Sequence, residues 1–305
     1  MHVVADIACD HCTLGIALLK SEVAQRVIAV DVCTSPLATG RTKAERLLAP
    51  DLRDCLDLRL GDGLRPLTVA DRVNTVCVVG IGAYSVLNIL DSSINDHEDI
   101  NLGRASDQIA DSHAGADKLV DILGVQRLVL QPVDSRPHLM VPLRRWLLER
   151  GWRITEETLS GNNKRQLYLT MLAERKHSGG VDSSIDSINA GAKKAIACDT
   201  GGEAIDIEDL ILPQALRRRM HCILRDTDKQ RALGEKNDAD TSEAPATDSF
   251  DTELLLWMKY VKLHHDWIAV ARFDAYDKKS GLPPGAISAV MAAERLSLRS
   301  FGLKT

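Results

Sequence analysis

The sequence contains no apolar run that approaches the length of a membrane span, so a membrane is not expected among its partners. It also has no excess of positive charge. Lys and Arg number 38 against 43 Asp and Glu, which gives a net charge of -5 at pH 7. Because a chain without a global positive field is not drawn to nucleic acid as a whole, any RNA contact has to use a local basic patch.

A disulfide framework is not expected either. The cysteines number 7, an odd count, and several fall within apolar, strand-like runs, among them Cys33, Cys55 and Cys77. This usage is typical of reduced core residues in an intracellular protein, located in the cytoplasm or in an organelle. No signal peptide precedes the first predicted strand, which begins almost directly after Met1, and the natural protein could carry a further N-terminal segment.

The glycines of a dinucleotide-binding loop are missing from the stretch that organises the chain. Residues 3–32 predict a strand, a tight loop, a helix and a second strand, with Asp6 in the first strand and Asp31 closing the second. An acid at the end of the second strand of such a βαβ unit commonly accepts the hydroxyls of a ribose. Ala8 and Cys12 stand where the loop would need glycine, which argues against NAD and leaves other nucleoside ligands open.

Apolar runs that alternate with helical patterns continue to about residue 175 and predict an α/β fold. The central runs are nearly continuous, as in buried parallel strands, and the last two read as an antiparallel hairpin. We therefore expect a Rossmann-like open sheet with an antiparallel edge. The strands are predicted at residues 3–7, 27–30, 55–60, 73–79, 127–130, 153–159 and 166–172.

Composition shifts divide the rest of the chain. Residues 1–175 are predicted to form the Rossmann-like domain, with a polar surface insertion near 91–113. Residues 176–202 are rich in Ser, Gly, Asp and Ala and read as a linker. A helical C-terminal domain is expected over 203–305, with a low-complexity insertion at 235–249. Within it, Arg217 to Arg219 fit either contact with tRNA phosphates or a solvated helix face.

The loops that follow the predicted strands carry a recognisable series of motifs. In chain order they read DIACDH, AVDV, GDGL, GIGA and LQPV, and Leu143-Arg144-Arg145-Trp146-Leu147 follows on a helix that is expected to be basic on one side. This series resembles the TrmK family of tRNA (adenine-N1)-methyltransferases, whose motifs are D-I-G-x-D-H, an acid after the second strand, G-D-G-L, G-M-G-G and L-Q-P-N. The resemblance is close over about the first 175 residues and loose beyond them, with a C-terminal helical domain implied there.

The resemblance implies a function and a set of site residues. The cofactor would be S-adenosylmethionine, the partner tRNA, and the product a methyl group on N1 of the adenine at position 22, in a reaction that needs no metal. Residues after the fourth and fifth strands would face the target base, namely Gly80, Gly82, Gln131 and Pro132. Those expected at the cofactor are Asp6, Asp10 and His11 at its methionine end, Asp31 at the ribose, and Asp62 with Gly63 at the adenine.

Four departures from the family pattern keep other interpretations open. Ala8, Cys12 and Ala83 replace glycines and Val133 replaces an asparagine, so the fold could be a non-catalytic module that binds RNA or another partner. Asp31 and Asp62 could be turn residues, and His11 a polar residue at a helix start. Cys9 and Cys12 form a C-x-x-C that also fits a redox pair, or with His11 an incomplete zinc site.

Overall fold

The computed structural model describes residues 2–92, 118–161, 167–175, 195–196, 205–212, 256, 258–263, 277 and 281–300. The chain divides into two compact units. Unit 1 comprises Met1–Val133 and Met171–Arg175, and unit 2 comprises Asp134–Thr170 and Lys176–Thr305. None of the described helices is long and apolar enough to cross a membrane.

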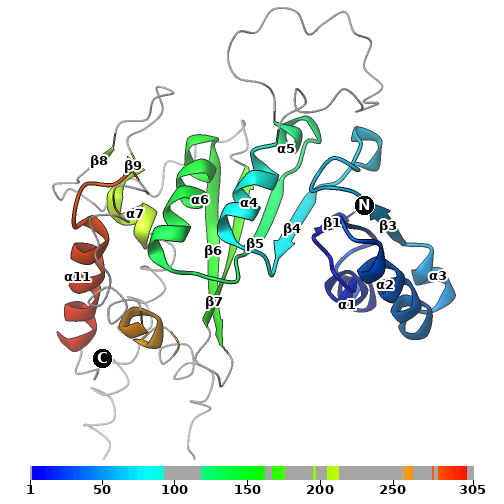
Figure 1. The fold of residues 1–305 in the computed structure, drawn as a ribbon, viewed down its shortest axis with the longest axis horizontal. Coiled ribbons are helices and arrows are strands. Elements are labelled where there is room, and N and C mark those ends of the chain that lie inside the picture. Colours follow the sequence, from blue (N-terminus) through cyan, green and yellow to red (C-terminus); the bar gives the residue numbers. More distant parts are fainter. Residues whose placement is uncertain are drawn as a thin grey trace, which may run out of the picture. The chain divides into compact units, whose positions relative to one another are not determined.

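Seven strands form one sheet in the order β3-β2-β1-β4-β5-β7-β6 (Figure 1). Neighbours among the first five strands of this order are parallel, and β7 runs antiparallel to β5. The predicted Rossmann-like sheet with an antiparallel edge is confirmed. The strands are β1 (Val3–Ile7), β2 (Arg26–Asp31), β3 (Leu56–Leu60), β4 (Thr75–Val79), β5 (Arg127–Gln131), β6 (Trp152–Gly161) and β7 (Leu167–Arg175).

The centre of the sheet is apolar, and the edge strand β3 carries charged side chains. All five residues of β1 are buried, as expected for a parallel strand covered on both faces. On β3, by contrast, the Arg59 guanidinium donates to Asp71 at 2.6 Å and to Asp57 at 2.8 Å. Arg26 of β2 reaches the same Asp57 carboxylate at 3.0 Å. These charges join β3 to β2 and to the short 3-10 helix Val69–Asp71.

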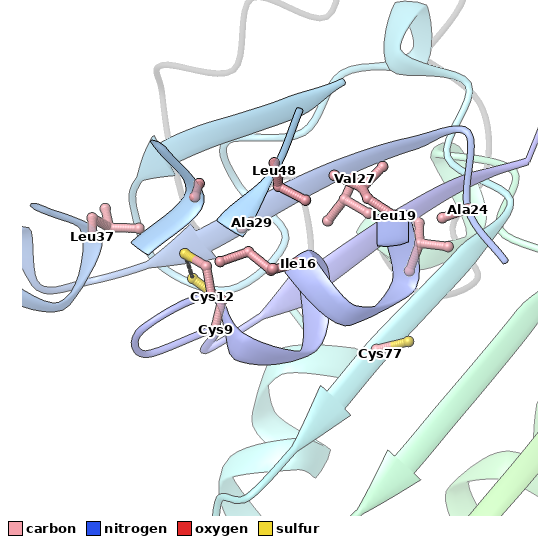
Figure 2. Close-up of a cluster of buried hydrophobic side chains, with 12 residues drawn as sticks. Cys9, Cys12, Ile16, Leu19, Ala24, Val27, Ala29, Leu37, Leu48 and Cys77 are labelled. Atoms are coloured by element: carbon pink, nitrogen blue, oxygen red, sulfur yellow. Dashed lines mark hydrogen bonds between the residues drawn. The ribbon is translucent and has the colours of Figure 1, made fainter. Parts of the chain in front are cut away.

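The helices of unit 1 lie between the strands in sequence. Ile16 and Leu19 of the first helix pack with Val27 and Ala29 of β2 in one buried cluster (Figure 2). This packing fixes the loop that precedes the helix, because the helix cannot shift without opening the core. The helices are α1 (Thr13–Lys20), α2 (Thr34–Leu47), α3 (Pro50–Arg53), α4 (Ala83–Leu90) and α5 (Leu119–Ile122).

Unit 2 contains β6, the first part of β7 and several helices. The helix expected at the end of the chain is confirmed, and residues 256 and 258–263 within the predicted helix 252–276 are helical. Two short strands pair antiparallel, one of them in the segment expected as a linker. The elements are α6 (Pro137–Glu149), β8 (Ala195–Ile196), β9 (Ile205–Asp206), α7 (Ile207–Ile211) and α11 (Ala286–Ser300).

Some expectations concern parts of the chain that the structure does not describe. They are the polar insertion beyond residue 92, the arginines at 217–219 and the low-complexity segment at 235–249. The domain boundaries at 175 and 202 stay predictions.

A buried ion pair joins elements of unit 2. The Arg144 guanidinium on α6 lies 3.0 Å from the Glu157 carboxylate on β6, and both side chains are fully buried. Arg144 also donates to the main-chain oxygens of Leu210 at 3.2 Å and Ile211 at 2.6 Å, which end α7. Burial raises the pKa of Glu157, while the Arg144 charge opposes this. The expectation that this helix is basic on one side is wrong at Arg144, since the charge of Arg144 is used inside the unit.

We expect Glu157→Leu to lower the free energy of unfolding by about 3 to 5 kcal/mol, because it leaves the Arg144 charge buried without its partner. The double variant Arg144→Met with Glu157→Leu removes both charges and should lose less. Denaturant unfolding followed by circular dichroism measures both. A double variant no more stable than Glu157→Leu would show that the unpaired charge is not the cause.

Candidate active site

The predicted site residues all lie in unit 1, at the carboxyl edge of its parallel strands. Asp6 is in β1, Asp31 ends β2 and Gln131 ends β5. From β1 the strand order continues to β2 and β3 on one side and to β4 and β5 on the other, so the order in which strands are added reverses between β1 and β4. Ligands of open α/β sheets bind at this edge, beside such a switch point. The remaining residues follow the same strands, with Asp10 and His11 after β1, Asp62 and Gly63 after β3, Gly80 and Gly82 after β4, and Pro132 after β5.

The loop after β1 has an unusual backbone. Ala8, Asp10 and Cys12 have φ angles of 58°, 49° and 55°, in the left-handed region that favours glycine. The loop is held in this form by two main-chain hydrogen bonds, from the Cys12 amide to the Cys9 oxygen at 2.9 Å and from the Cys9 amide to the Val30 oxygen at 3.1 Å. Each left-handed residue with a side chain costs about 1 to 2 kcal/mol. Ala8 and Cys12, which replace glycines of the family pattern, therefore lie where a glycine would relieve backbone strain.

The side chain of Cys12 is accommodated by α2. Cys12 is fully buried at the start of α1. Gly40, in the middle of α2, faces it so closely that a Cβ there would lie 2.6 Å from the Cys12 sulfur and 3.2 Å from its Cβ. A glycine within a helix signals such a close approach of another part of the chain, but the sequence alone did not show which part.

Asp31 connects the loops that follow the first three strands. Its Oδ2 accepts the Asp10 amide and its Oδ1 accepts the Cys33 amide, both at 2.9 Å. Its main-chain oxygen accepts the Gly61 amide at 2.9 Å, after β3. The carboxylate is partly exposed and keeps a lone pair on each oxygen for a ligand, since a carboxylate has about four acceptor sites.

Asp6 is a buried acid beside this loop. It is 3% exposed as a residue, and its Oδ2 accepts the Gly15 amide at 3.1 Å. Burial raises the pKa of Asp6 to about 7; the hydrogen bond from Gly15 lowers it and the Asp31 charge adds to the rise. The group therefore gains or loses a proton near neutral pH, a property common at functional sites.

The loops after β4 and β5 are joined to each other. Gly80 has a φ angle of 84° and its amide donates to the Gln131 oxygen at 2.9 Å. The Val133 amide donates to the Ile81 oxygen at 3.0 Å. Gly82 precedes α4, and Ala83 lies in the first turn of that helix without a positive φ. The departure at Ala83 thus carries no left-handed strain.

The other predicted cofactor residues are more exposed. Asp62 pairs with Arg65 at 2.8 Å on the surface. Gly63 has a φ angle of 57°, which only glycine adopts freely. His11 Nδ1 lies 2.5 Å from the Asp10 carboxylate, and both residues are exposed. These groups remain accessible to a ligand from solvent.

Exposed apolar side chains accompany the polar ones at this edge, and sequence reasoning did not single out most of them. Val32, directly after Asp31, is 62% exposed and Leu60, at the end of β3, is 56% exposed. Tyr84 in the first turn of α4 is 37% exposed, and Val133 after β5 is 45% exposed. Carboxylates beside apolar surface suit a ligand that combines a flat ring with a polar sugar. For Val32, the available sequence signal was its position directly after an acid at a strand end.

Comparison with known proteins gives one family match. It covers residues 1–105. The matching family is described as a methyltransferase domain. The matched stretch includes β1 to β4, with Asp6 in β1 and Asp31 at the end of β2, and the loop after β3 that carries Asp62. No curated protein matches the chain.

Solved structures similar to this chain at low sequence identity include two TrmK proteins and a protein from Listeria monocytogenes. The B. subtilis m1A22 tRNA methyltransferase TrmK is 16% identical, with a TM-score of 0.49, over 98% of this chain and 91% of that chain. M. capricolum TrmK, crystallised with S-adenosyl-homocysteine, is 14% identical, with a TM-score of 0.44, over 89% and 92%. A Listeria monocytogenes protein is 16% identical, with a TM-score of 0.47, over 84% and 90%.

We expect Ala8→Gly to raise the free energy of unfolding of unit 1 by about 0.5 to 1 kcal/mol. The left-handed strain it removes exceeds the added entropy of the unfolded chain. Ala17→Gly, at an exposed position within α1, is the matched control and should lower stability by about 1 kcal/mol. Denaturant unfolding measures both, and equal losses in the two variants would contradict the strain at Ala8.

The raised pKa of Asp6 predicts a pH dependence of stability. In the folded chain this pKa is about 7, against an ordinary value of 3.8, so the folded state holds the proton more firmly. The unfavourable contribution of Asp6 therefore grows as the pH rises from about 4 to about 7 and then levels off. Asp6→Asn should remove this contribution, so the Tm difference between wild type and variant should change between about pH 4 and about pH 7. Asp54→Asn, on the surface, is the control, and parallel Tm curves for Asp6→Asn would refute the shift.

Proposed function

We propose that the chain transfers a methyl group from S-adenosylmethionine to N1 of an adenine in tRNA, at position 22 as in the TrmK family that its motifs resemble. The observation that carries the proposal is the meeting of those motifs at one edge of the sheet. Asp6 and Asp31 lie there beside the left-handed loop, within the stretch that matches a methyltransferase domain.

The residues at this edge suit the cofactor. S-adenosylmethionine supplies a methyl group that is bonded to a positively charged sulfonium. The carboxylates of Asp6 and Asp31 place negative charge where a cation would bind, and Asp6 binds it best when ionised. Asp31, held by the Asp10 and Cys33 amides, can accept ribose hydroxyls. Exposed Val32 and Leu60 offer apolar surface to an adenine ring near Gly63 and Asp62.

The target adenine is assigned to the loops after β4 and β5. The N1 lone pair of adenine is itself the nucleophile, so the chain has to orient the base rather than remove a proton. The part of these loops that faces the base would be polar and narrow, and it would be formed by Gly80, Gly82, Gln131 and Pro132. The base has to leave its stack to reach it, and exposed Tyr84 offers an aromatic face for stacking.

A non-catalytic descendant of the methyltransferase fold is the second candidate. Strained side-chain residues replace glycine at positions 8 and 12, and Val133 offers an apolar side chain where the family has an asparagine. All three positions lie at the proposed site. Cofactor affinity separates the two candidates, because a module that only binds a partner needs no cofactor.

Calorimetric titration with S-adenosylmethionine should show saturable binding in the micromolar range. Asp31→Ala should weaken it by a factor of about ten, equivalent to about 1.4 kcal/mol, because a ribose contact is lost. Asp54→Ala, an exposed acid at the end of α3, is the matched control and should bind as wild type does. Absence of heat at millimolar ligand from folded protein would favour the non-catalytic module.

The reaction itself is tested on tRNA transcripts with radiolabelled methyl donor. Label is expected in N1-methyladenosine, and a transcript with guanine at position 22 should accept none. Equal labelling of both transcripts would reject the proposed target position, while cofactor binding without any labelling would reject the reaction.

A further inference from the structure

Two thiols lie next to each other in the loop that follows β1. The sulfur atoms of Cys9 and Cys12 are 3.6 Å apart and share a hydrogen bond, shown by the dashed line in Figure 2. Both are free cysteines and both are buried, Cys9 at 7% and Cys12 at 0% exposure. The hydrogen bond from the Cys12 amide to the Cys9 oxygen, at 2.9 Å, closes the turn between them.

We propose that Cys9 and Cys12 are a site of reversible oxidation to a disulfide, and that the oxidised loop binds the cofactor more weakly. The first half depends on the loop alone. The second half rests on the function proposed above.

The geometry of the turn favours ring closure. A disulfide needs its sulfur atoms at about 2.0 Å, so the two atoms have to approach by about 1.6 Å. The turn has already brought the two residues together, which removes most of the entropy cost of closing the ring. The hydrogen bond between the two sulfurs lowers the pKa of Cys12, and the same bond, followed by burial, raises the pKa of Cys9, so Cys12 is the better thiolate.

Hydrogen peroxide, a small uncharged oxidant, suits buried thiols. The thiolate sulfur attacks one peroxide oxygen, the O–O bond breaks, and a sulfenic acid and hydroxide result. The second sulfur then attacks the sulfenic sulfur, the S–S bond forms, and hydroxide leaves and takes up the thiol proton as water. The two thiols lose two electrons and the peroxide gains them. A dithiol reductant reverses the step by exchange.

Oxidation of Cys9 and Cys12 would disturb the neighbouring residues that are proposed to bind the cofactor. Asp10 lies between the cysteines, and its amide donates to Asp31 at 2.9 Å. The Cys12 sulfur sits against Gly40 of α2, and closing the bond requires this sulfur or that of Cys9 to move within the packed loop. Because Asp10 and Cys12 are already left-handed, the loop has little freedom to absorb the change elsewhere. We therefore expect the support of Asp31 to weaken.

A metal site is a weaker explanation of the pair. The described residues contain no group of three or more His, Cys, Asp or Glu side chains that could hold a metal ion. Structural zinc requires four ligands, and the two thiols provide half of them.

The first experiment identifies the bond. The full chain is treated with hydrogen peroxide, remaining thiols are alkylated, and the digest is analysed by mass spectrometry. We expect a peptide with Cys9 linked to Cys12 that disappears after dithiothreitol. Cys55→Ser, which alters a cysteine outside the loop, should still give it, whereas Cys9→Ser and Cys12→Ser should not. A chain in which both thiols are alkylated after peroxide treatment would overturn the proposal.

The second experiment measures the consequence. Titration with S-adenosylmethionine should give a Kd about fivefold or more higher for the oxidised protein, restored by reduction. Peroxide should leave the Kd of the double variant Cys9→Ser with Cys12→Ser unchanged, because neither thiol of the loop is left to oxidise. Equal Kd values for the oxidised and the reduced wild-type protein would refute the effect of the disulfide on cofactor binding, even where the linked peptide shows that the disulfide forms. If the reduced protein does not bind S-adenosylmethionine, the proposed function is refuted, and so is the effect of oxidation on cofactor binding. The linked peptide would still show whether Cys9 and Cys12 form a disulfide.

Discussion

The Asp31 carboxylate connects the loops around which the candidate site is built. It accepts one amide from the loop after β1 and another from its own strand end, while its main-chain oxygen holds the loop after β3. A charge that accepts hydrogen bonds from amides is stabilised without a cation, and the bonds in turn fix the backbone that provides them. The same group that would hold a ribose therefore determines the shape of the loop beside it.

The positions of the central strands could be predicted from sequence because their apolar runs are nearly continuous and each ends on a polar or glycine-containing loop. The run at residues 73–79 is apolar enough for a buried helix, but the glycine that follows it favours a short strand; β4 spans Thr75–Val79 and ends before Gly80. The burial of Arg144 could not be predicted. Beside Arg145 and Trp146 it resembled a surface cation, and its partner Glu157 lies on another element.

The residues of the site could be selected from sequence because each follows a strand, and parallel strands end at one edge. Their chemistry could not. The raised pKa of Asp6 depends on burial under Gly15 and α1, and the contact of Cys9 with Cys12 depends on a turn of left-handed residues. Both properties arise from backbone geometry, which the loop sequence DIACDH does not reveal by itself.

The contact between Cys12 and Gly40 has a consequence for how this sequence can change. The volume of the sulfur atom is provided by a missing side chain on another element, so the two positions share one space. A glycine at position 12 would leave room for alanine at position 40, whereas a cysteine at position 12 excludes it. Related sequences should therefore exchange these residues in pairs, and either change alone would pass through a cavity or a collision.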